Sequence, residues 1–130
     1  MTDIDQMPAG REMDALVAER VMEWQADDGG FGSGEVQYWM DGNRMAKHGD
    51  WSPSDNDSHT FEVVDKMIAD GWEFSLGYEA DWKTSPWAAD FSRPWLYSSE
   101  PAVIGVANCA TRALAICRAA LKAMEAERAA

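Results

Sequence analysis

Apolar residues recur at steps of three and four within residues 51–72, and this spacing predicts an amphipathic helix near the middle of the chain. The apolar positions are Phe61, Val64, Met67 and Ile68. Pro53 disfavours helical geometry at the residue before it, so Ser54 is the predicted N-cap. Gly71 is the predicted residue just past the helix, where a left-handed backbone costs least.

The same spacing predicts a helix near each end of the chain. The first covers residues 11–24, and its apolar face is formed by Met13, Leu16, Val17, Val21 and Trp24. The last is expected to begin near Val106, with a buried stripe formed by Ala110, Ala113, Leu114, Cys117, Leu121 and Met124. Residues 1–10 are expected to be a loose, flexible tail.

Alternating apolar and polar residues predict short strands between the helices. Residues 72–80 place Trp72, Phe74 and Leu76 on one face, and residues 86–91 do the same with Trp87, Ala89 and Phe91. Gly77 is expected to mark a bulge. The order of elements predicts the α+β class, as a layered α/β/α sandwich with a small antiparallel sheet flanked by three helices.

Residues 27–50 are interpreted as an insertion rich in glycine and aromatic residues. Its first part, DDGGFGSGE, is expected to be a flexible loop, because acidic residues and glycines cluster there. A phosphate-binding loop is not expected, because no Gly-Lys-Ser/Thr ending follows and no predicted strand precedes it. Residues 36–40 are expected to pair across the turn 41–43 with residues 44–50. Residues 93–97, RPWLY, are expected to form an aromatic loop or a short edge strand.

A single domain covering residues 1–130 is expected, because two separate cores in a chain of this length would each be marginal. The chain has no apolar run long enough for a bilayer and no signal-peptide pattern at its start, so we expect a cytoplasmic protein. Cys109 and Cys117 lie eight residues apart in the predicted last helix, about 12 Å along its axis. That distance exceeds the reach of a disulfide, and we expect two buried thiols.

The formal net charge is −12, from 23 acidic and 11 basic residues. A protein that binds duplex nucleic acid normally carries a basic stripe, so we expect no direct binding to nucleic acid. The acidity leaves open that the surface imitates nucleic acid and docks on another protein.

Three blocks of the sequence resemble the phage ABA-sandwich domain family of small phage and prophage proteins. They are MDALVAERVMEW, then WSPSDN followed by FEVVDKM and WEFSL, and finally TRALAICRAALKAMEAE. The sequence departs from the family pattern at Arg112, where a small residue or proline is expected, and in the longer insertion at residues 27–50. The resemblance implies a phage or prophage origin, an α/β/α fold and no established enzymatic chemistry.

Several small phage α/β proteins are sponges that bind cyclic nucleotide or cyclic ADP-ribose immune signals. The chain is similar to them in size and setting, and not in motif. This similarity favours a ligand-binding protein without identifying the ligand. The hypothesis that we prefer is an anti-defence protein in the infected bacterial host that binds a nucleotide-type ligand. The alternative is an acidic protein that mimics DNA or docks on a host enzyme.

The candidate catalytic and metal-ligating residues lie close together in the sequence and are His48, Asp50, Asp55, Asp57 and His59. The two histidines lie eleven residues apart across a proline turn, which is unlike a metal pair on one helical turn. A calcium loop is excluded by Thr60 and Lys66 at the positions of its glycine and glutamate. We therefore expect no metal, no cofactor and no catalysis, and a metal-dependent phosphodiesterase using His59 is the least favoured alternative.

The candidate ligand site combines aromatic, hydroxyl and guanidinium groups near predicted helix starts and in the aromatic loop. Its members are Trp51, Ser52, Ser54, Arg93, Trp95, Thr111 and Arg112. An aromatic ring can stack on a base, and an arginine or a helix start can hold a phosphate. Asp55 and Asp57 at the same helix start would repel an anion, and each site residue also has an ordinary structural role.

Some of the aromatic residues are expected to be exposed, since a domain of this size cannot bury all of them. The set of which not all can be fully buried is Tyr38, Trp39, Trp82, Trp87, Trp95 and Tyr97. Aromatic residues are enriched where proteins meet, so we expect a homo-oligomer.

Overall fold

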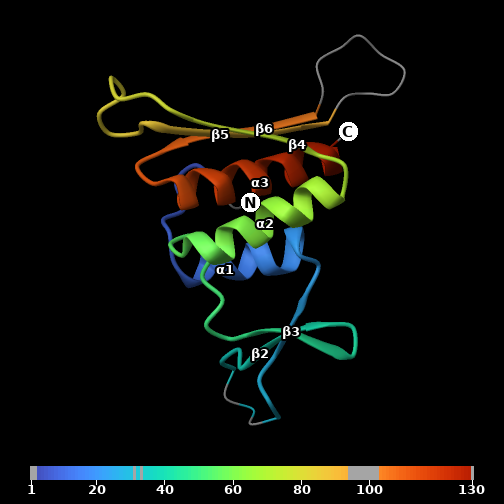
Figure 1. The fold of residues 1–130 in the computed structure, drawn as a ribbon. Helices are drawn as coiled ribbons and strands as arrows, with labels where there is room; N and C mark the ends of the chain where they lie inside the picture. Colours follow the sequence, from blue (N-terminus) through green and yellow to red (C-terminus); the bar gives the residue numbers. More distant parts are fainter. Residues whose placement is uncertain (1–2, 31, 33, 94–102, 130) are drawn as a thin grey trace.

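The computed structural model describes residues 3–30, 32, 34–93 and 103–129. The elements in chain order are α1 (Arg11–Leu16), η1 (Val17–Val21), β1 (Gln25–Asp27), β2 (Tyr38–Asp41), β3 (Arg44–His48), α2 (Asp57–Ala69), β4 (Glu73–Tyr78), β5 (Trp87–Arg93), β6 (Val103–Cys109) and α3 (Arg112–Ala129). Within the described residues the strands form two antiparallel sheets, β1–β2–β3 and β4–β5–β6. The helices lie between the two sheets (Figure 1). The predicted α+β class is confirmed, with two sheets where one was expected.

The first helix runs from α1 directly into η1, where the Met22 N–H donates to the Val17 carbonyl at 3.1 Å. Its core-facing residues Met13, Val17 and Val21 are buried, as predicted. The helix ends before Trp24, about one turn earlier than predicted, because Glu23 adopts a left-handed backbone with φ 62°. Trp24 instead packs edge-on against Trp51, with ring centroids 4.9 Å apart.

The two ends of α2 show one prediction wrong and one confirmed. Ser54 is not the N-cap, because the chain makes a further turn and Asn56 takes that position, accepting a hydrogen bond from His59 N–H at 3.3 Å. Gly71 has φ 97° and ends the helix as predicted. Its N–H donates to the Ile68 carbonyl, and the N–H after it donates to the Met67 carbonyl, each at 3.0 Å. This pair of bonds is a Schellman motif.

The buried face of α2 is rotated from the predicted stripe. Thr60, Val63, Val64 and Met67 are buried, whereas Phe61 and Ile68 are 45% and 52% exposed. Thr60 can take a core position because its hydroxyl lies 2.5 Å from the Pro53 carbonyl and 2.8 Å from the Asn56 carbonyl. A polar group with such partners can be buried at little cost.

Strands β4 and β5 form where predicted, and Phe74, Leu76, Ala89 and Phe91 lie on their shared inner face. Gly77 pairs with Ala88 in unbroken register, so the predicted bulge is wrong. Strand β6 was also missed, since the last helix was expected to begin near Val106. In β6 the large residues Ile104 and Val106 are exposed, and the smaller residues Gly105, Ala107 and Cys109 are buried.

Helix α3 packs on the inner face of β5 and β6, and its backbone lies directly against β6 (Figure 1). A Cβ atom placed on Gly105 would lie 2.1 Å from the Ala119 carbonyl oxygen and 2.3 Å from the Ala123 nitrogen. Glycine is needed at this position because no side chain fits between the strand and the helix. The middle of α3 is consequently buried on most sides.

The N-terminal segment is packed on the core, and the predicted loose tail is wrong for residues 3–9. Ile4 and Met7 are buried. The Arg118 guanidinium donates to the Met7 carbonyl through Nη2 at 2.7 Å and through Nε at 3.3 Å, and Lys122 pairs with Asp5 at 3.0 Å. Apolar anchors and a charged hydrogen-bond donor from α3 therefore fix this segment.

Both cysteines are free and buried, as predicted. The two residues do not lie on one helix as predicted, however, because Cys109 ends β6 and only Cys117 lies in α3. Burial raises the pKa of both thiols. Each thiol is therefore less readily ionised than a free cysteine.

The smaller sheet contains the predicted hairpin, with β2 and β3 joined across Gly42 and Asn43. The third strand, β1, pairs with β2 and was not predicted. Of residues 93–97, only Arg93 lies within the described part of the chain. No helix in the described residues has the length and apolar character needed to cross a bilayer.

Candidate functional site

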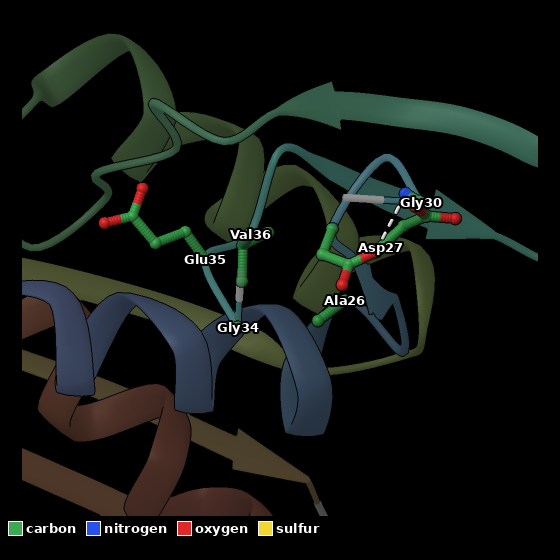
Figure 2. A pocket seen from close by; sticks show the side chains of 7 residues that line it. Ala26, Asp27, Gly30, Gly34, Glu35 and Val36 are labelled. Carbon is green, nitrogen blue, oxygen red and sulfur yellow. Dashed lines mark hydrogen bonds between the residues drawn. The ribbon is translucent and has the colours of Figure 1, made fainter. Parts of the chain in front are cut away.

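A hollow beside the loop after β1 has a volume of about 490 Å³ and is shown in Figure 2. It is lined by Ala26, Asp27, Asp28, Gly30, Gly34, Glu35 and Val36, and none of these is basic. The Asp28 carboxylate accepts a hydrogen bond from Gly30 N–H at 2.8 Å, and Asp27 accepts one from Gly29 N–H at 2.7 Å. In Figure 2 the Glu35 side chain points away from Asp27. Asp27 and Asp28 stabilise the turns of the loop. The hollow offers no positively charged side chain to an anion.

A groove lies where α2 and α3 begin, and we call it the helix-start groove. Its volume is about 390 Å³, and it is lined by Ala9, Ser54, Asp55, Asp57, Trp87, Ala110, Thr111, Arg112 and Ala113. Three predicted site residues, Ser54, Thr111 and Arg112, therefore come together from distant parts of the sequence. Asp55 and Asp57 line the same groove, as the sequence indicated.

Arg112 is the basic group of the helix-start groove. Its Nη2 lies 2.5 Å from an Asp57 carboxylate oxygen, and its guanidinium carbon lies 5.7 Å from the centre of the Trp87 ring. The hydrogen bond from Arg112 holds the pKa of Asp57 below its usual value, and the same bond raises the pKa of Arg112. An anion entering the groove would thus compete with Asp57 for this guanidinium.

The two hydroxyl residues of the groove both have structural partners. The Thr111 hydroxyl accepts a hydrogen bond from Leu114 N–H at 3.2 Å and so caps α3. Ser54 is buried, and its hydroxyl accepts from Gly10 N–H at 3.0 Å. The Ser54 N–H donates to the Asp14 carboxylate at 2.8 Å. Each hydroxyl oxygen therefore already accepts one hydrogen bond from the protein backbone.

Trp51 lies outside the helix-start groove, against the prediction. It is 4% exposed, and its ring stacks on His59 with centroids 5.1 Å apart. Ser52 supports this stack, because its N–H donates to His59 Nδ1 at 3.0 Å. The aromatic residue of the groove is Trp87, which sequence reasoning had placed on a strand face without assigning it to the site.

Trp51 lines a different cavity of about 270 Å³, which we call the indole pocket. Its lining residues are Arg11, Asp14, Ala15, Gly34, Glu35, Val36, Trp39, Gly49 and Trp51. Asp14 is only 6% exposed. Burial raises its pKa, which hydrogen bonds from Ser54 partly offset. The bond between Ser54 and Asp14 joins the wall of the groove to the wall of this pocket.

Arg93 and Trp95 do not join the predicted site. Arg93 donates to the Asp70 carbonyl, pairs with Glu127 and lies over Trp72 at 4.4 Å from the ring centre. Residues 112 and 127 are fifteen positions apart on α3, so Arg93 lies roughly 22 Å along the helix from Arg112. Trp95 lies outside the described residues.

No group of three or more histidine, cysteine, aspartate or glutamate side chains is placed to hold a metal ion in the described part of the chain. His59 uses Nδ1 to accept a hydrogen bond from Ser52 and stacks on Trp51. These contacts give His59 a structural role at the start of α2.

The family model of the phage ABA sandwich domain matches residues 15–121 of this chain. Curated proteins gave no match in a separate comparison, and solved structures gave none either. The family match confirms the resemblance seen in the sequence. The matched residues include every lining residue of the helix-start groove except Ala9.

Proposed function

We propose that this chain, which belongs to the phage ABA sandwich domain family, is a non-catalytic protein that binds a nucleotide-type ligand in the helix-start groove. The observation that supports this proposal best is the position of Arg112 over the Trp87 ring, where two helices begin. A base stacked on an aromatic ring contributes about 1–3 kcal/mol. A guanidinium and the N–H groups of a helix start both favour phosphate.

Asp57 opposes an anion in the groove, but its pair with Arg112 is weak. Both side chains are 45% exposed, and exposed ion pairs contribute little to stability because water and salt screen them. A phosphate can accept two parallel hydrogen bonds from a guanidinium and so replace the carboxylate. Binding therefore requires Arg112 to change partner, with little loss of stability in the protein.

The biological role that we propose is sequestration. In the cytoplasm of an infected bacterial host, the protein would bind a cyclic nucleotide or cyclic ADP-ribose immune signal and leave it chemically unchanged. The host defence enzyme that needs this signal would then receive less of it.

Isothermal titration calorimetry with cyclic dinucleotides, cyclic trinucleotides and cyclic ADP-ribose isomers tests this proposal. We expect at least one of these ligands to bind, and Arg112→Ala and Trp87→Leu each to weaken binding about tenfold or more. Arg128→Ala is the matched control, because Arg128 is exposed near the opposite end of α3. If the protein binds none of the panel, the proposal is wrong.

A second candidate function rests on how the basic residues are used. Those paired with acidic side chains are Arg20, Lys47, Lys66, Arg93, Arg112 and Lys122. Because these basic side chains are already paired with acidic side chains of the same chain, the remaining acidic residues leave the surface with an excess of negative charge. We propose as the alternative that this surface mimics nucleic acid and docks on a host enzyme. Inhibition of a DNA-binding enzyme that added salt reverses would favour this function.

A further inference from the structure

We infer that the outer face of the sheet β4–β5–β6 is a docking surface for a basic amphipathic helix of another protein. The outer face is formed by the alternate residues of the three strands whose side chains point away from α3, and its larger members are Glu73, Asp90, Ile104, Val106 and Asn108. Its other positions carry serine, glycine or alanine. None of these residues lines the helix-start groove, so the inference does not depend on the proposed function.

The first observation is that this sheet is covered on one side only. Helix α3 packs on the inner face, where Ala89, Phe91 and Ala107 are buried. No residue of the outer face is buried, and none of the described helices lies over it (Figure 1). The outer face is therefore open to a partner.

The second observation is a row of apolar side chains on β6. Ile104 and Val106 are each 44% exposed, whereas an antiparallel sheet with one face in water usually presents polar residues there. Strand β6 also forms an edge of its sheet, and its sequence VIGVANC has no charged residue and no proline. Charges and prolines normally protect an exposed edge strand from other chains. Covering this row with an apolar partner surface would be favourable.

The third observation is a set of carboxylates beside the apolar row. Asp90 lies directly opposite Val106, and Glu73 lies opposite Ser92, which in turn lies opposite Ile104. Neither carboxylate has an ion pair within the described residues, and no position of the outer face carries a lysine or an arginine. This surface is complementary to a helix whose apolar stripe is bordered by lysine or arginine.

The size of the outer face suits one helix. Three strands about 4.8 Å apart and about 20 Å long give an area of roughly 300 Å². A stable dimer buries about 800 Å² on each partner, so an interface of this size is typical of a weak, transient contact. A second copy of the chain is also disfavoured by charge, because Asp90 lies at the middle of β5 and would face its own copy.

The probe that we propose is a synthetic helical peptide in which leucines form one stripe and lysines border it. Titration of the native protein is followed by ¹H–¹⁵N NMR. We expect the shifted backbone signals to be concentrated in β4, β5 and β6. A peptide with glutamate in place of lysine, and a peptide with the same residues in shuffled order, should each bind at least about fivefold more weakly.

Variants of the protein locate the binding surface. Val106→Thr and Asp90→Asn should each weaken binding of the lysine peptide about threefold or more, because they remove an apolar contact and a charge. Threonine is well accepted in strands, and the NMR spectrum of each free variant shows whether the fold is kept. Ile68→Thr and Asp65→Asn are the matched controls, since these exposed residues form a similar apolar and acidic pair on α2, and they should leave binding unchanged.

Several results would overturn the inference. Equal weakening by the α2 controls would show a general attraction between a basic peptide and an acidic protein. Equal binding of the glutamate peptide would show that the carboxylates play no part. Unshifted sheet signals at millimolar lysine peptide would leave the outer face without this partner. Signals of Ile104 and Val106 that shift with protein concentration alone would assign the face to a second copy of the chain.

Discussion

Gly105 is the residue on which the packing of α3 against β6 depends. A methyl group there would collide with the backbone of Ala119 and Ala123, and overpacking of this kind costs about 1–3 kcal/mol. We expect Gly105→Ala to lower the free energy of unfolding by at least that amount in urea denaturation. Gly77→Ala is the control, because a Cβ there meets nothing within 4 Å, and we expect a change below about 1 kcal/mol. Equal effects of the two substitutions would contradict this account.

Asp14 gives the fold a pH dependence whose sign can be stated. Burial raises the pKa of Asp14 above its ordinary value of 3.8, so the folded state binds this proton more tightly than the unfolded state. The contribution of Asp14 to the free energy of unfolding therefore falls as the pH rises from 3.8 to the pKa of Asp14 in the folded state. Above that pKa the contribution stays at its lower value. An asparagine side chain at this position would not ionise and would keep an oxygen for the Ser54 N–H.

As the pH rises from 3 to 7, the free energy of unfolding of Asp14→Asn should consequently increase relative to that of the parent protein. Urea denaturation of both proteins at the two pH values measures this difference. A relative loss of stability over the same interval would show that the hydrogen bonds from Ser54 outweigh the cost of burying the charge.

The candidate site shows what could be predicted at the scale of single residues. Arg112 and Thr111 could be predicted, because the chemistry of an arginine and a hydroxyl at a helix start is local. Trp51 could not be distinguished from Trp87, because sequence does not say which indole the fold buries. The predicted N-cap role of Ser54 is wrong for a related reason, since its hydrogen-bond partners Gly10 and Asp14 lie about forty residues away.

Among the elements, α3 holds the N-terminal segment through Arg118. Its guanidinium donates to the Met7 carbonyl, and a hydrogen bond from a charged donor contributes about 1.5–3 kcal/mol. We expect Arg118→Ala to destabilise the protein by about this amount and to increase amide hydrogen exchange in residues 3–10. Arg128→Ala, near the end of the same helix, should change neither quantity. Unaltered exchange in Arg118→Ala would show that Ile4 and Met7 suffice to hold the segment.

The helices and strands differ in how well their patterns report the fold. The first helix, β4 and β5 have large apolar residues on the buried face, so their periodicity predicts them. In β6 the sizes are reversed, because α3 lies so close that only Gly105, Ala107 and Cys109 fit beneath it. The close approach of α3 to β6 is a tertiary contact, and the local sequence pattern does not predict it.

At the scale of the whole molecule, exposed aromatic residues support self-association, which we propose. Tyr78 at the end of β4 is 60% exposed, and Trp82 in the following connection is 51% exposed. We expect sedimentation velocity at micromolar concentrations to show a species larger than the monomer, and Trp82→Ser to shift it toward the monomer. Phe61→Ser, at an exposed position on α2, is the matched control. A native protein that sediments as a monomer throughout would contradict the proposal.

The arrangement of the groove also belongs to this scale. Asp57 and Arg112 are 55 residues apart, and their pairing depends on how α2 and α3 pack together. Sequence reasoning could name the groups that suit a nucleotide, but it could not tell which helix starts would face each other.

The most direct test of the proposed function is a crystal structure of the protein with the tightest-binding nucleotide of the calorimetry panel. The account predicts the base on the Trp87 ring and the phosphate on the Arg112 guanidinium, which has left Asp57. A nucleotide bound elsewhere, with Arg112 still paired to Asp57, would contradict it.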